Sequence, residues 1–237
     1  MKKTTLTRKL SALVFALLAG QVALASAAGA QGLLGFLVPP APPAPAAAPA
    51  QAAAAPATPQ QVEQKLAALK YDVGPADGNI DEQAASAVMA FQKVNNLPRT
   101  GELTPEVAAR IMATQASPEP LVPSGEADRI EISLARQVLF LYQGGTLNRI
   151  LPVSSGTSET PTPTGTFRIY RQDSGWHTSR LGRLHNAQYF IGGYAIHGSL
   201  SVPPEPASHG CVRIPMSASE WFPSHVNKGM QVVILES

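Results

Sequence analysis

The segment from Ile196 to Pro215 contains the only cysteine of the 237-residue chain and two of its five histidines. Cys211 lies in a stretch rich in glycine, serine and proline, and His197 precedes it by 14 positions. A cysteine nucleophile requires a partner that favours the thiolate, donors for an oxyanion, and access for the substrate. This segment has residues suited to each role, so it predicts a nucleophilic thiol in a loop.

The residues around Cys211 suggest how such a site is assembled. His197 follows an apolar run that begins at Tyr189, so a strand can place it beside the cysteine that the next loop returns. The carbonyl of Gly198 can hold one ring nitrogen of the histidine, so that the other nitrogen faces the sulfur. The backbone N–H groups of Gly210 and Cys211 can point at the oxygen of an attacked carbonyl, because glycine permits the unusual turn that this needs.

Polar residues next to the cysteine predict a binding rim. Arg213 can reach back toward a carboxylate, and Ser208 and His209 complete the rim. Zinc binding by His197, His209 and Cys211 is an alternative, because imidazole and thiolate are good zinc ligands. The segment lacks an acidic fourth ligand and the paired spacing of structural zinc motifs, so we expect neither a metal nor a cofactor.

The amino-terminal residues predict export. Four basic residues precede the apolar run Ala12–Ala19 and small residues follow it, as in a cleavable signal over residues 1–30. An uncleaved membrane anchor is the alternative, but the run is well short of the ~20 residues that a spanning helix needs. We therefore expect an exported protein of the cell envelope or wall, with no stable membrane anchor once the signal is cleaved.

A single cysteine is informative in an exported chain. It cannot form an internal disulfide, so it is either an intermolecular link or a reactive thiol. A buried cysteine that acts as a small hydrophobe is the third reading, and it fits poorly among loop-forming residues. The net charge is only +2 and no basic run is present, so nucleic acid is not an expected partner.

Three short helices are predicted after a proline- and alanine-rich linker over residues 31–57. Thr58 to Gln61 has the form of a capping box with proline at the first helical position, and it opens a bundle over residues 58–115. The second helix is expected from about Asp81 to Asn95, and the third begins at Thr104. The residues expected to face inward are Val62, Leu66, Leu69, Ala84, Val88, Phe91, Val107, Ala108, Ile111 and Met112.

The hydrophobic period changes after a second predicted linker at residues 116–128. Ile130, Ile132 and Leu134 alternate with polar residues, and Val138 to Tyr142 forms a strongly apolar run before a Gly-Gly turn. We therefore expect residues 129–237 to form a mainly β domain, a sandwich or partial barrel whose long loops carry the chemistry. The expected fold class is α+β with two domains.

Residues 64–78 and 87–106 resemble the peptidoglycan-binding repeat found on many cell-wall hydrolases and transferases. The resemblance implies a wall-binding helical domain, although a purely structural bundle is the alternative. Residues 79–83 depart from the repeat, which has a glycine-containing segment there. The matching residues are Leu66, Leu69, Tyr71, Asp77, Gly78, Ala87, Phe91, Gln92, Leu97, Thr100, Gly101 and Leu103.

The letters "HGS" at residues 197–199, followed by "SHGCVRIP" at 208–215, resemble the signature of the L,D-transpeptidase catalytic domain. These enzymes are the cysteine transpeptidases of bacterial cell walls. The stretch from Leu151 to Ile169 is similar to the strand and loop that precede the signature in the family. The resemblance extends from about Arg129 to Leu235.

The resemblance implies a two-step acyl transfer on peptidoglycan stems. Cys211 attacks the carbonyl between the third residue of a tetrapeptide stem and its terminal D-alanine, while His197 supports the thiolate and then protonates the departing amine. The side-chain amine of a diamino acid on a second stem takes up the acyl group, which cross-links the wall. The residues that would fix the stem are Arg213, Ser208, His209 and Tyr194.

Other outcomes of the same site stay open. Release of the acyl group to water would make an L,D-carboxypeptidase, and transfer to a wall protein would make an anchoring enzyme. A non-catalytic peptidoglycan-binding protein is the alternative from another class. A β-lactam of the carbapenem type, which resembles the acyl donor of the family, is expected to add once to Cys211 if the thiol is catalytic.

Overall fold

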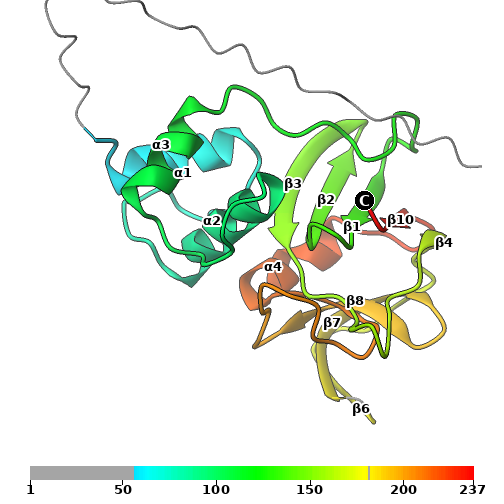
Figure 1. Ribbon diagram of the computed structural model, residues 1–237. Helices are drawn as coiled ribbons and strands as arrows, with labels where there is room; N and C mark the ends of the chain where they lie inside the picture. Colours follow the sequence, from blue (N-terminus) through cyan, green and yellow to red (C-terminus); the bar gives the residue numbers. More distant parts are fainter. Residues whose placement is uncertain (1–55, 181) are drawn as a thin grey trace, which may run out of the picture. The chain divides into compact units, whose positions relative to one another are not determined.

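The computed structural model describes residues 56–180 and 182–237 (Figure 1). The predicted signal over residues 1–30 lies outside these residues, as does all but the last two positions of the predicted linker over residues 31–57. No helix within the described ranges is long and apolar enough to cross a membrane.

The three predicted helices are confirmed, and each begins at a side-chain cap. The capping box at Thr58 is complete, because its hydroxyl accepts from the Gln61 N–H while the Gln61 side chain accepts from the Thr58 N–H. Asp81 and Thr104 accept from the first turns of the other two helices. The helices are α1 (Pro59–Ala68), α2 (Glu82–Val94) and α3 (Pro105–Ala113).

One inward residue was predicted wrongly. Met112 is 38% exposed, whereas its neighbour Ile111 is fully buried. Successive helical residues are about 100° apart, so the narrow contact face of this short helix cannot bury both side chains.

The β region consists of two open sheets rather than a closed barrel. The first sheet has the order β3-β2-β1-β10-β4, and β1 and β10 pair in parallel. Its strands are β1 (Arg129–Ser133), β2 (Val138–Gln143), β3 (Thr146–Pro152), β4 (Gly165–Arg168) and β10 (Gln231–Leu235). The second sheet has the order β5-β7-β8-β9, and β6 also pairs with β7. Its strands are β5 (Arg171–Gln172), β6 (Trp176–Ser179), β7 (Gly182–Ile191), β8 (Tyr194–Ser199) and β9 (Val212–Pro215). The short helices α4 (Met216–Trp221) and η1 (Phe222–Ser224) follow β9.

Strand β2 explains why its sequence is an unbroken apolar run. Leu139 and Leu141 belong to the core between the two sheets, whereas Phe140 and Tyr142 belong to a second core shared with the three helices. Successive side chains of a strand point to opposite faces, so both faces of β2 are buried. Figure 1 shows α2 beside β3, in agreement with their contacts. The α+β prediction is confirmed, and the described residues all belong to one compact unit.

Candidate active site

Strands β8 and β9 bring the proposed catalytic residues together. They are parallel neighbours in which His197 is paired with Arg213, and Cys211 stands directly before β9. Paired residues point to the same face of a sheet, as do residues two apart along a strand. His197, Arg213 and Cys211 accordingly line one cavity of about 530 Å³.

His197 is held in one orientation. Only 5% of the residue is exposed, and its Nδ1 lies 2.9 Å from the carbonyl oxygen of Gly198. A neutral ring that donates from Nδ1 to this carbonyl keeps a lone pair on Nε2, where it can accept a proton. Burial lowers the pKa of His197, the bond to Gly198 opposes that shift, and the nearby cation of Arg213 adds to it. The imidazole is therefore a neutral base at neutral pH.

Cys211 is a thiol at rest. Burial raises its pKa, while a backbone hydrogen bond from Ala195 and the charge of Arg213 oppose the shift. The sulfur lies 3.9 Å from the carbonyl oxygen of Gly193, which can accept the S–H. Attack by this sulfur consequently requires that its proton be removed during the reaction.

The loop before Cys211 is tied by hydrogen bonds. Ser208 Oγ donates to the carbonyl oxygen of Cys211 at 2.5 Å and accepts from the Gly210 N–H at 3.1 Å. Gly210 has a φ of +106°, and a Cβ there would lie 2.1 Å from Tyr194 Cε1. Glycine is therefore required at position 210 for both reasons.

A second loop, which contains Gly156 and Thr162, supports the loop before Cys211. The sequence-based prediction missed the residues of this second loop. Thr162 Oγ1 donates to the carbonyl oxygen of Gly210 at 2.9 Å and accepts from the Gly156 N–H at 2.9 Å. Ser154 pairs its N–H and carbonyl with those of Arg213. The only signal for these residues was the family-like stretch from Leu151 to Ile169, which did not indicate individual roles.

The predicted rim residues occupy different places. Arg213, Ser208 and the exposed His209 line the cavity. The ring of Tyr194 instead packs against the Cα of Gly210. Gly198 lies outside the cavity lining, where a Cβ would lie 2.3 Å from Ser219 Oγ.

The chain has two matches to family models. The model of the L,D-transpeptidase catalytic domain matches residues 127–234, and the model of a peptidoglycan binding domain matches residues 57–111. The solved L,D-transpeptidase structure from Xylanimonas cellulosilytica DSM 15894 is 35% identical, with a TM-score of 0.68 over 75% of this chain and 92% of that chain. The chain belongs to the L,D-transpeptidase family.

The chain was also compared with other solved structures and with curated protein sequences. The L,D-transpeptidase from Stackebrandtia nassauensis is 26% identical, with a TM-score of 0.47 over 74% of this chain and 89% of that chain. No curated protein sequence matches the chain.

Family membership makes the protein an acyltransferase of peptidoglycan cross-linking, and the predicted enzyme class and substrate polymer are confirmed. The L,D-transpeptidase cavity is strongly basic. Among the described residues that line it are four arginines, three histidines and no aspartate or glutamate. Arg171 lies over the Tyr189 ring at 3.7 Å and Arg183 over the Trp176 ring at 4.3 Å, so aromatic faces orient both guanidinium groups.

The two histidines outside the cavity lining contact neighbouring side chains. His185 is buried and its Nδ1 lies 2.9 Å from Ser219 Oγ, and the half-buried His225 packs against the Trp221 ring. Within residues 56–180 and 182–237, no group of three or more histidine, cysteine, aspartate or glutamate side chains could hold a metal ion.

Proposed function

We propose that Cys211 is the nucleophile and His197 the general base of this L,D-transpeptidase. The observation that carries the proposal is the parallel pairing of β8 with β9, which places both residues in one cavity while Gly198 leaves Nε2 of His197 free to accept a proton. The reaction is an acyl transfer in two steps through a thioester.

In the first step His197 Nε2 takes the thiol proton as the sulfur attacks the stem carbonyl. The negative charge of the tetrahedral intermediate falls on the carbonyl oxygen, which we propose is held by the N–H groups of Cys211 and Gly210. The Gly210 N–H also contacts Ser208 Oγ, so it would be shared or released as the intermediate forms. His197 then donates the proton to the departing amine of D-alanine, and a thioester is left on Cys211.

In the second step the amine of a diamino acid on another stem attacks the thioester. His197 accepts a proton from this amine and passes it to the sulfur, which leaves as the Cys211 thiol, and a peptide bond joins the two stems. If water attacks instead, the product is a shortened stem and the enzyme is an L,D-carboxypeptidase; a wall protein that supplies the amine would be anchored by the same chemistry.

The basic cavity supports the proposed binding roles. Arg213 and His209, which line the cavity, would contact carboxylates of the stem, and Ser208 would contact its backbone. Tyr194 and Gly198 would act from behind the site, by supporting Gly210 and by orienting His197.

We also propose the arrangement of the chain. Residues 1–30 would direct export and residues 31–57 would form a spacer, so that the enzyme acts in the cell envelope or wall. The helical domain over 58–115, the connection over 116–128 and the catalytic domain over 129–237 follow. The connection contacts the helical domain, where Ser117 Oγ donates to the Leu69 carbonyl, and the catalytic domain, where the Leu121 N–H donates to the Glu131 carboxylate.

The test is mass spectrometry of purified tetrapeptide muropeptides after incubation with the protein. We expect dimers linked through their third residues, and none with Cys211→Ala or His197→Gln. His225→Gln is the matched control, since His225 lies outside the cavity lining. Tripeptide without dimers would favour the carboxypeptidase, and cross-linking that survives in Cys211→Ala would overturn the assignment of the nucleophile.

A further inference from the structure

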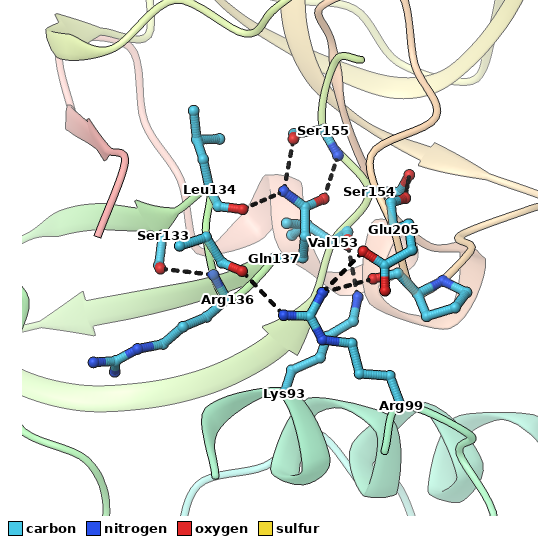
Figure 2. A network of polar contacts seen from close by, with 12 residues as sticks. Lys93, Arg99, Ser133, Leu134, Arg136, Gln137, Val153, Ser154, Ser155 and Glu205 are labelled. Atoms are coloured by element: carbon cyan, nitrogen blue, oxygen red, sulfur yellow. Dashed lines mark hydrogen bonds and ion pairs between the residues drawn. The ribbon is translucent and has the colours of Figure 1, made fainter. Parts of the chain in front are cut away.

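Two basic side chains of the helical region contact the backbone near the nucleophile loop (Figure 2). Lys93, in the last turn of α2, is fully buried, and its Nζ donates to the carbonyl oxygen of Val153 at 2.8 Å. Arg99 donates to the carbonyl oxygen of Pro204 at 3.3 Å and to that of Ala135 at 3.0 Å. These contacts join the helices to two segments, residues 153–156 and 204–208, which we call the supporting segments.

The supporting segments are bonded directly to the residues of the site. Ser154, next to Val153, pairs with Arg213, and its hydroxyl donates to the carbonyl oxygen of Glu205 at 2.8 Å. The Ser155 carbonyl accepts the N–H of Ser208, the residue whose hydroxyl holds the loop before Cys211. A displacement of either segment must therefore move the nucleophile loop.

Gln137, the residue directly before β2, adds to the same network. Its side chain accepts from the Ser155 N–H at 2.8 Å and donates to Ser155 Oγ at 2.7 Å, as Figure 2 shows. The first supporting segment is thus held from the sheet by Gln137 and from the helices by Lys93.

A buried lysine is a costly way to pack a helix against a sheet. Burial lowers the pKa of Lys93 to about 7, the cation of Arg99 adds to the shift, and Glu205 opposes it. Replacing buried charged groups by apolar residues of similar volume is often neutral or stabilising. Packing alone therefore does not account for this side chain, whereas orienting one carbonyl next to the site does.

The ion pair between Arg99 and Glu205 contributes less to this network than the hydrogen bonds of Arg99 to backbone carbonyls. Its Nη1 lies 3.3 Å from Glu205 Oε2, but the Glu205 side chain is 68% exposed. Solvent-exposed ion pairs contribute little to the stability of a fold. The bonds from Arg99 to the carbonyls of Pro204 and Ala135 join the helical region to two backbone segments that are far apart in the sequence.

We propose that Lys93 and Arg99 are positioning residues for the Cys211 loop, so that the helical region contributes to the acyl-transfer step itself. This inference rests on the proposed role of Cys211. The helical region would then speed the reaction of a small soluble donor that is too short to be held by a wall-binding domain.

The experiment compares the full chain with Lys93→Met and Arg99→Gln. Methionine keeps the length of the lysine stem and removes its donor, and the matched control Lys65→Met makes the same change on α1. The rate constant for acylation of Cys211 by a carbapenem, and kcat and KM for a soluble tetrapeptide stem, are measured well below the Tm of each variant. We expect Lys93→Met and Arg99→Gln to lower the acylation rate constant and kcat about tenfold, with KM within about twofold of the wild type.

Rescue distinguishes positioning from stability. Arg99→Lys, which keeps one donor, should recover part of the rate, whereas a purely structural role would change only the Tm. Folded Lys93→Met and Arg99→Gln proteins that acylate at the wild-type rate would overturn the inference. If Lys93→Met fails to fold, Arg99→Gln decides. A wild-type protein that takes up no carbapenem at Cys211 would instead contradict the proposed function, so the two failures are separable.

Discussion

At the residue scale, burial sets the protonation of Cys211 and His197, the proposed catalytic pair. It raises the pKa of Cys211 and lowers that of His197, so both neutral forms are favoured. Arg213 lowers both pKa values, which favours the thiolate and disfavours the imidazolium. The resting residues are therefore a thiol and a neutral base that line one cavity, and the proton is transferred during the attack.

This state predicts the pH dependence of acylation. The rate constant with a carbapenem should rise with pH through the pKa of His197, below the ordinary value of 6.5, and stay level through pH 8 because the base is already neutral. His197→Gln should lower the rate at pH 7 by about 100-fold or more and replace the plateau by a rise that follows thiol ionisation. The measurement is mass-resolved acylation between about pH 5 and 8. A wild-type rate that still climbs steeply from pH 7 to 8 would argue for a preformed thiolate instead.

At the element scale, the site depends on two loops that hold each other. The Thr162 hydroxyl joins the Gly156 N–H to the Gly210 carbonyl, and a Cβ on Gly156 would lie 2.8 Å from the Gly210 Cα. The loops approach so closely that neither can shift alone. The position of Cys211 therefore depends on both loops.

Thr162→Val tests the clamp that the Thr162 hydroxyl forms between the two loops. Valine keeps the shape of threonine but leaves the part-buried Gly156 N–H and the buried Gly210 carbonyl without their partner, so the free energy of unfolding should fall by about 1–3 kcal/mol. The acylation rate should fall as well, because the carbonyl of Gly210 adjoins Cys211, the proposed nucleophile. Thr166→Val, on the exposed part of β4, is the control and should change neither quantity appreciably. Urea unfolding and carbapenem acylation measure the two effects, and an unchanged rate in a destabilised Thr162→Val protein would show that the clamp serves stability only.

At the scale of the whole molecule, β2 joins the helical and catalytic regions into one folded unit. Its alternate side chains fill two cores, and full burial of one large apolar side chain such as Phe140 contributes about 1.5–3 kcal/mol. The buried amine of Lys93 crosses the same interface. The stability of the unit must therefore depend on pH through this residue.

The direction of that dependence follows from linkage. The pKa of Lys93 is about 7 in the folded protein and near 10.5 when the chain is unfolded, so between these values only the unfolded chain binds the proton. Stability is therefore lost as pH falls from 10.5 toward 7. The stability of the wild type relative to Lys93→Met should rise with pH across this window, by at most about 1.4 kcal/mol per pH unit. Chemical unfolding at several pH values measures it, and a difference independent of pH would contradict the prediction.

Signals that lie within a few residues of one another determined much of this protein from the sequence alone. The capping box at Thr58, the helix starts at Asp81 and Thr104, the apolar run of β2 and the cluster around Cys211 are local patterns, and they predicted the helices, the β region and the family. Tertiary structure alone decided the partners from distant segments. Thr162 meets Gly210 across 48 positions and Lys93 meets Val153 across 60. Neither pair has a periodic or compositional signal, because such contacts form only when packing of the sheets and helices has brought the segments together.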